Sequence, residues 1–153
     1  MANYVYNIAK GRVVEYYNRV ENNDPAASAL IIVPLETSGL EAQSVLEDKD
    51  DLSALLSGTT NEQTTMGRKT LTDADLAALP APDDTNNRYS LDLPDWTWTA
   101  ATGNAISGFV VCYDNDTAAG TDSNIIPLTF HDLVVTPTGT DITPTTTEFF
   151  RAS

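Results

Sequence analysis

The apolar residues of this chain are gathered in short runs bounded by turn residues, and this pattern limits the possible folds most. Residues 29–33 and residues 107–113 are apolar at nearly every successive position. Neighbouring side chains of a strand point to opposite faces of a sheet, so both runs predict central strands buried on both faces. Long stretches with helical periodicity are absent, and Thr, Gly and Pro recur throughout, which favours short strands joined by turns.

Other segments predict half-buried strands. In residues 88–93, Tyr89, Leu91 and Leu93 alternate with polar residues, so one face of the strand is apolar. Residues 11–20 are also predicted to form a strand with one apolar face. Further strands are predicted over residues 96–99, 124–135 and 142–150.

Two short helical turns are predicted between the strands. In the first, three leucines face inward, Asp48 caps the start and Gly58 ends it. In the second, Thr72 and Asp75 have the spacing of a capping box, and Pro80 ends the turn. Seven or eight short strands with one or two short helices inserted indicate a mainly β, single-domain antiparallel β-sandwich or jelly roll.

A length of 153 residues suits one domain. Residues 1–10 lack a clear pattern, and we expect them to form an N-terminal arm that becomes ordered on a neighbour. Residues 11–153 then form the single β-rich domain. Tyr4, Tyr6 and Tyr17 are expected to be exposed aromatics that bind a partner, with ordinary packing as the alternative.

The chain is strongly acidic, with 22 Asp and Glu against 8 Lys and Arg and a formal charge of −14. Such a field repels phosphate backbones and anionic membranes, so neither nucleic acid nor a membrane is an expected partner. Residues 29–33 are too few to span a bilayer, and the first residues lack the apolar segment of a signal peptide. Synthesis in a cytoplasm is expected, and the acidic loop at Asp83 and Asp84 is expected to meet basic partner residues.

No catalytic site and no cofactor are predicted. His131 is the only histidine, and its neighbour Asp132 lies on the opposite face of a predicted strand, so the two side chains do not pair. Leu128 and Phe130 are expected to share the face opposite His131. The only cysteine, Cys112, lies in an apolar run and is predicted to be a buried hydrophobic residue. One histidine and one cysteine do not make a zinc site without carboxylates.

The loop between Asp114 and Asp122 has two interpretations. Its three carboxylates are of the kind that bind calcium, but Gly120 and Ile125 do not fit the EF-hand spacing. A tight loop closed by Asx turns explains the same residues and is preferred. No metal site is therefore predicted.

A carbohydrate-binding site is a further alternative. Trp96 and Trp98 are predicted to share one face, and Asp92 and Asp95 lie beside them. Aromatic residues next to carboxylates occur in sugar sites, whereas aromatic residues on a strand are more often part of a core or an interface.

Several stretches of the chain resemble small virion proteins of tailed bacteriophages and prophages, of the capsid decoration or cement type. They are residues 10–17 (KGRVVEYY), 69–76 (KTLTDADL) with the loop to Asn87, 112–114 (CYD) and 125–132 (IIPLTFHD). The resemblance implies a β-rich structural protein without catalytic residues, located on the capsid exterior of the virion. It implies that the protein binds the major capsid protein and neighbouring copies of itself and bridges capsid subunits. A tail, neck or receptor-binding part of a phage remains an alternative.

Overall fold

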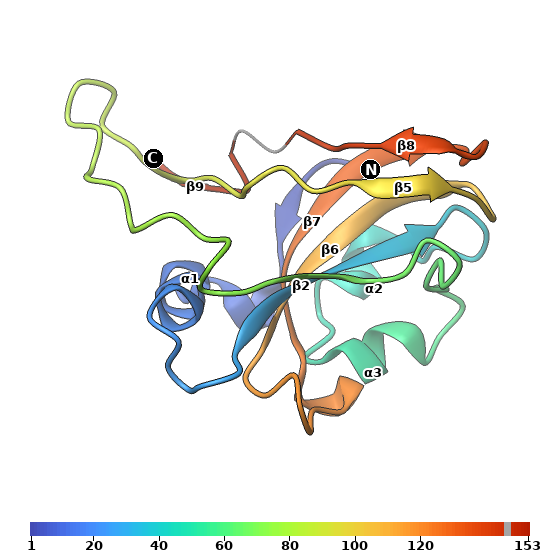
Figure 1. The fold of residues 1–153 in the computed structure, drawn as a ribbon, viewed down its shortest axis with the longest axis horizontal. Coiled ribbons are helices and arrows are strands. Elements are labelled where there is room, and N and C mark those ends of the chain that lie inside the picture. The colour runs from blue at the N-terminus through green and yellow to red at the C-terminus, as the bar shows by residue number, and fades with distance from the viewer. Residues whose placement is uncertain (146–147) are drawn as a thin grey trace.

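The structure, a computed structural model, describes residues 1–145 and 148–153. Its centre is an antiparallel sheet of five strands in the order β1-β7-β6-β2-β3 (Figure 1). Two smaller sheets pair β4 with β9 and β5 with β8. The strands are β1 (Tyr4–Val5), β2 (Ala29–Glu36), β3 (Lys69–Leu71), β4 (Tyr89–Leu91), β5 (Trp98–Ala101), β6 (Ile106–Asp114), β7 (Ile126–Val135), β8 (Thr140–Ile142) and β9 (Phe150–Ala152).

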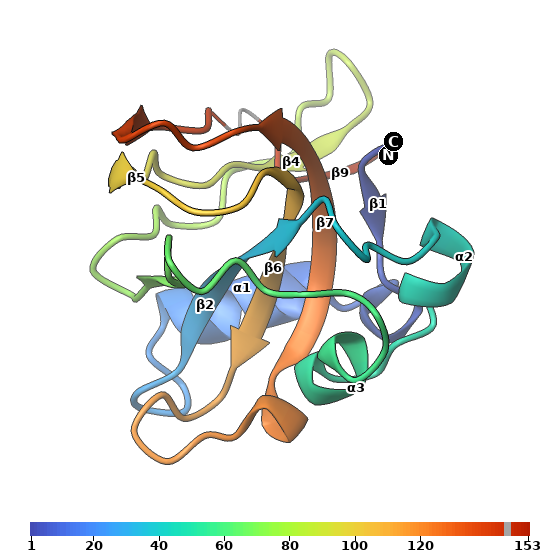
Figure 2. The ribbon, with the colours of Figure 1, turned by 90° about the vertical axis from the view of Figure 1, so that its right-hand side faces the viewer.

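Helices cover both faces of the central sheet. The longest helix, α1 (Val13–Glu21), packs on one face, and the short helices α2 (Gln43–Leu46) and α3 (Leu52–Leu56) lie on the other (Figure 2). Two 3₁₀ turns, η1 (Asn7–Ala9) and η2 (Asp122–Asn124), join strands to their neighbours. The mainly β class predicted from the sequence is confirmed, with 32% strand and 16% helix. Among the described residues, no helix has the length and apolar character needed to cross a membrane.

The two predicted central strands are confirmed as β2 and β6. In β2, Leu30 and Ile32 point into the core under α1, whereas Ile31 and Val33 point into the core under α2 and α3. β6 lies between β2 and β7 and is buried along almost its whole length. Apolar residues at successive positions therefore supply both layers of the core at once.

The strand predicted over residues 11–20 is wrong, because this segment forms helix α1. Its buried residues Val13, Tyr16, Tyr17 and Val20 follow the spacing of one helical face. Aromatic and β-branched residues are common in strands, so the residue types of this segment are also typical of a strand.

The N-terminal residues belong to the fold of the single chain. Tyr4 and Val5 pair with Phe130 and Thr129 of β7, and the Tyr6 N–H donates to the Leu128 carbonyl at 2.9 Å. The Tyr6 side chain is fully buried. The expected arm, ordered only on a neighbour, is corrected for this segment, because its apolar residues and backbone groups already have partners.

One predicted helical turn is confirmed and one is wrong. Helix α3 forms, but its cap is Asp51 rather than Asp48, because the Asp51 carboxylate accepts the Ala54 N–H at 2.7 Å. At the second site the Asp75 carboxylate accepts the Thr72 N–H at 2.8 Å, yet only a turn follows. Pro80 comes too soon after the turn for a helix to extend.

The later strands differ in their bounds from the prediction. Strand β7 begins at Ile126, after η2, and β5 begins at Trp98. In the predicted strand 142–150, β8 ends at Ile142 and β9 begins at Phe150, while residues 146–147 lie outside the described residues.

A shift in the pairing of β6 with β7 changes which side chains share a face. Val111 pairs with Thr129 and Cys112 pairs with Pro127, so one extra residue of β7 lies between them. Leu128 then enters the core under α1, whereas Phe130 enters the core under α2 and α3. The expectation that these two residues share a face is therefore wrong, because a bulge interrupts strict alternation.

Candidate functional site

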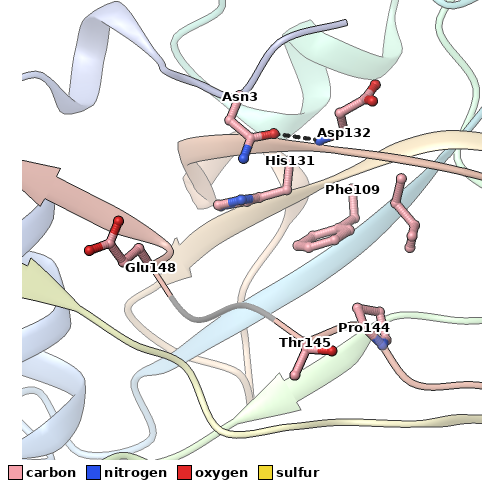
Figure 3. A pocket seen from close by; sticks show the side chains of 8 residues that line it. Asn3, Phe109, His131, Asp132, Pro144, Thr145 and Glu148 are labelled. Atoms are coloured by element: carbon pink, nitrogen blue, oxygen red, sulfur yellow. Dashed lines mark hydrogen bonds between the residues drawn. The ribbon is translucent and has the colours of Figure 1, made fainter.

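An open cleft of about 340 Å³ lies beside β7 (Figure 3). It contains the only histidine of the chain and two carboxylates, so it is the first candidate for a catalytic site. Its lining residues are Asn3, Phe109, His131, Asp132, Leu133, Pro144, Thr145 and Glu148.

His131 is held in place by the strand pairing beneath the cleft. It lies opposite Phe109 in the pairing of β6 with β7, and the two rings stack with centroids 5.1 Å apart. Thr129 and His131 share a hydrogen bond of 2.9 Å between Oγ1 and Nε2. Only 5% of the residue is exposed, and burial lowers the pKa of His131 to about 4. The imidazole is therefore neutral at pH 7.

The two carboxylates of the cleft have other partners. Asp132 forms an ion pair of 2.7 Å with the N-terminal amino group, and its N–H donates to Asn3 Oδ1. Glu148 accepts from Ser90 Oγ at 3.1 Å and pairs with two arginines, Arg88 and Arg151. In the described part of the chain, neither carboxylate hydrogen-bonds to His131. The described cleft therefore has no general base that a carboxylate orients.

Cys112 lies in β6, in the core under α2 and α3, and is fully buried. Burial raises the pKa of its thiol well above the usual range. A buried, protonated thiol is a poor nucleophile. The prediction of a buried hydrophobic cysteine is confirmed.

The loop between Asp114 and Asp122 is closed by its own carboxylates. Asp114 Oδ1 accepts the Asp116 N–H at 3.0 Å, and Asp116 Oδ1 accepts the Ala118 N–H at 3.0 Å. These bonds confirm the preferred interpretation as Asx turns. Among the described residues, no three His, Cys, Asp or Glu side chains gather in a way that would hold a metal ion.

Both tryptophans are buried in the core under α1. Trp96 and Trp98 meet edge to face at 6.1 Å, and Trp98 Nε1 donates to the Gly67 carbonyl at 2.9 Å. Neither ring face is free to stack on a sugar, although Asp92 and Asp95 are exposed. The feature that favoured a carbohydrate site is therefore contradicted.

Sequence reasoning missed a cluster of charges around Arg68. Its guanidinium binds both oxygens of Glu62 at 2.8 and 2.7 Å and both oxygens of Asp122 at 2.7 and 2.9 Å. These contacts raise the pKa of Arg68 and lower that of Asp122. The cluster fastens the segment before β3 to η2. Asp122 is 54 residues further along the chain, so no local pattern signals the contact.

The residues predicted to bind a partner do not form one site. Tyr4 is half-buried and stacks on Phe130 with centroids 5.1 Å apart. The expectation that Tyr6 and Tyr17 are exposed is wrong, because both are buried and the Tyr17 hydroxyl donates to a backbone carbonyl.

The acidic loop lies elsewhere. Asp83 binds Arg88 and Asn86, and Asp84 is exposed. Their loop projects from one end of the molecule, where the ribbon is yellow-green (Figure 1). This predicted contact region stays accessible in the described structure.

Comparison with known proteins finds no matching family model, no matching curated protein and no matching solved structure. The fold places the chain among mainly β proteins with a five-stranded antiparallel sheet.

Proposed function

We propose that this chain is a structural protein of a tailed-phage virion that binds the outer surface of the capsid and bridges neighbouring major capsid protein subunits. The sequence resemblance to capsid decoration proteins suggests the setting. The observation that carries the proposal is the way polar side chains are distributed between the interior and the surface of the protein. The groups with reactive potential are held inside the fold, whereas most of the acidic groups face solvent.

The ion pairs involve only a minority of the acidic residues. Among the described residues, the carboxylates that form ion pairs are those of Glu15, Glu62, Asp83, Asp122, Asp132 and Glu148. The chain has 22 acidic residues, so most of them keep an uncompensated charge. A surface of this kind is suited to meeting basic residues of a partner.

The same charge explains why a shell is a suitable partner. Copies at −14 repel one another in free solution, so contacts between them are weak. On a capsid, many weak contacts act together because neighbouring sites raise the effective concentration. The projecting loop at Asp83 and Asp84 is the contact that we propose for basic capsid residues.

Co-sedimentation with intact heads of the phage or prophage that encodes the chain tests the proposal. We expect saturable binding that weakens as salt is raised, because exposed charges are screened. The variant D83N/D84N should bind more weakly. D73N/D95N removes the same charge from exposed positions elsewhere and should bind like the unaltered protein.

Failure to bind heads at any salt concentration would contradict the proposal. Binding to purified tails but not to heads would also contradict it, and would instead favour a tail or neck part.

A further inference from the structure

A groove of about 380 Å³ beside α1 carries basic side chains on a molecule that is otherwise acidic. Its wall is formed by α1, the turn that follows it, the end of β6 and the start of β7. The lining residues are Arg12, Tyr16, Arg19, Pro25, Tyr113, Asn115, Asn124 and Ile126.

The groove follows from the helical spacing of α1. Arg12, Tyr16 and Arg19 are four and three residues apart, so they lie on one side of the helix. Tyr16 stacks on Tyr113 of β6 with ring centroids 4.6 Å apart. The Arg12 guanidinium lies 4.7 Å from the centroid of the Tyr16 ring, which helps to hold it at the groove.

Hydrogen-bond donors of the groove remain free. Arg12 and Arg19 each use Nε to bind Glu15, at 3.2 and 3.1 Å, and Arg19 also hydrogen-bonds to the Tyr113 side chain, which leaves further terminal N–H groups on both arginines. Their side chains are 50% and 44% exposed. The side-chain amides of Asn115 and Asn124 are exposed, and among the described residues neither has a hydrogen-bond partner. Two guanidinium groups and two side-chain amides therefore line the same groove.

We propose that this groove binds carboxylate side chains of a short acidic segment of a partner protein. The planar fork of a guanidinium matches a carboxylate in two parallel hydrogen bonds. The inference goes beyond the proposed place on a capsid, and it does not depend on it.

The groove does not suit a sugar or a nucleic acid. Tyr16 and Tyr113 are only 3% and 4% exposed and cover each other, so no aromatic face is free to stack on a sugar or a base. The charge of −14 repels a long polyanion. A short segment is different, because charges further than about 8 Å are largely screened at physiological salt. Of the nearby carboxylates, Glu15 binds both arginines and Asp24 also acts on Arg19, so a ligand is held by the remaining N–H donors of the groove rather than by a net positive charge.

Glu15 acts as a built-in competitor for the ligand. It binds both arginines in the structure, and their contacts lower the pKa of its carboxyl group. An incoming carboxylate has to share these guanidinium groups with Glu15. Replacing Glu15 by Gln removes the competing charge and should strengthen binding.

Fluorescence anisotropy with a labelled hexaglutamate peptide tests the groove, using the full-length protein at low and at physiological salt. We expect saturable binding that R12Q/R19Q weakens by about tenfold or more, since two charged contacts are lost. E15Q should bind more tightly than the unaltered protein. The melting temperature of each variant verifies that the fold is retained.

K49Q/K69Q is the matched control, because it removes two positive charges that lie outside the groove. It should bind the peptide almost as well as the unaltered protein does. Equal losses in both double variants would overturn the proposal, as would weaker binding by E15Q. Tighter binding of an oligogalacturonate than of the peptide would also overturn it, because the ligand would then be an acidic sugar.

Discussion

His131 stacks on Phe109 and bonds to Thr129, and this burial keeps its ring neutral. Arg68 is the opposite case, since a charged group is held between two carboxylates that accept its hydrogen bonds. Both residues would be candidates for chemistry on the basis of type alone. Their partners show that each stabilises the fold, and each contribution depends on pH in a way that can be measured.

The first prediction concerns His131. An unfolded histidine takes up its proton near pH 6.5, whereas the folded one does so only near pH 4. Between these values the unfolded state binds more protons, so the free energy of unfolding falls as the pH is lowered from about 6.5 to 4. A pKa difference of this size corresponds to about 3 kcal/mol. Urea unfolding at several pH values measures it.

His131→Asn is the comparison for this prediction. At pH 7 it should lose about 1 kcal/mol of stability, because the stacking on Phe109 is weakened. Its stability should then fall less than that of the unaltered protein as the pH drops to 4. Parallel pH profiles of the two proteins would show that His131 is not the cause.

The second prediction concerns Arg68. Arg68→Gln should lower the free energy of unfolding by about 2 kcal/mol, because Glu62 and Asp122 lose their partner. Partial exposure of the cluster keeps the loss below that of a fully buried pair. Arg12→Gln removes an arginine from an exposed ion pair and should change stability by less than about 0.5 kcal/mol.

The Arg68 contribution should also depend on pH. The pKa of Asp122 is lowered from its usual 3.8 in the folded state, so its stabilising effect is present above that value and is lost as the pH falls below it. The difference between the unaltered protein and Arg68→Gln should therefore shrink in acid. A difference that stays constant down to pH 2 would contradict this origin.

At the scale of elements, the sequence predicted those parts of the fold whose pattern is local. The apolar runs of β2 and β6 need two buried faces, and only a central strand provides them. Helix α1 was missed although Val13, Tyr16, Tyr17 and Val20 have helical spacing, because their residue types favour strands. The helical spacing of the apolar residues predicts this element correctly, whereas their residue types do not.

Features that depend on residues far apart in the sequence could not be predicted from local patterns. The bulge that separates Leu128 from Phe130 arises in the pairing with β6, and the burial of Tyr6 requires β7 beside it. The groove of Arg12 and Arg19 appears only when α1 is recognised as a helix, since the two residues then share one side. Because residues 11–20 were predicted to form a strand, this groove was not identified from the sequence.

The third prediction concerns the N-terminal segment around β1 and η1. Tyr6→Ala should lower the free energy of unfolding by about 3 kcal/mol or more, because a fully buried aromatic side chain leaves a cavity. Deleting residues 2–8 should lower the melting temperature further. Val134→Ala is the control, because that side chain is 74% exposed, and its effect should stay within about 0.5 kcal/mol. An unchanged melting temperature of the deletion variant would show that this segment is a dispensable arm.

At the scale of the whole molecule, charge is distributed unevenly around a mainly β core. Among the described residues, most carboxylates form no ion pair, and all five arginines have carboxylate partners. The two arginines beside α1 share a single glutamate. The projecting loop at Asp83 and Asp84 and the groove of Arg12 and Arg19 therefore offer opposite charges to different partners.

The fourth prediction follows from the net charge of −14. Repulsion among the exposed carboxylates opposes the compact state, and salt screens this repulsion. The melting temperature at pH 7 should therefore rise by a few degrees as sodium chloride is increased from low to about physiological concentration. A steady fall over this range would show that the ion pairs, rather than the repulsion, dominate the response to salt.

The most direct test of the proposed function is cryo-electron microscopy of virions of the phage or prophage that encodes the chain. We predict density on the outside of the shell, in contact with neighbouring major capsid protein subunits. The five-stranded sheet with α1 on one face and α2 and α3 on the other should fit this density. Density confined to the tail or neck, or virions that lack the chain, would contradict the account.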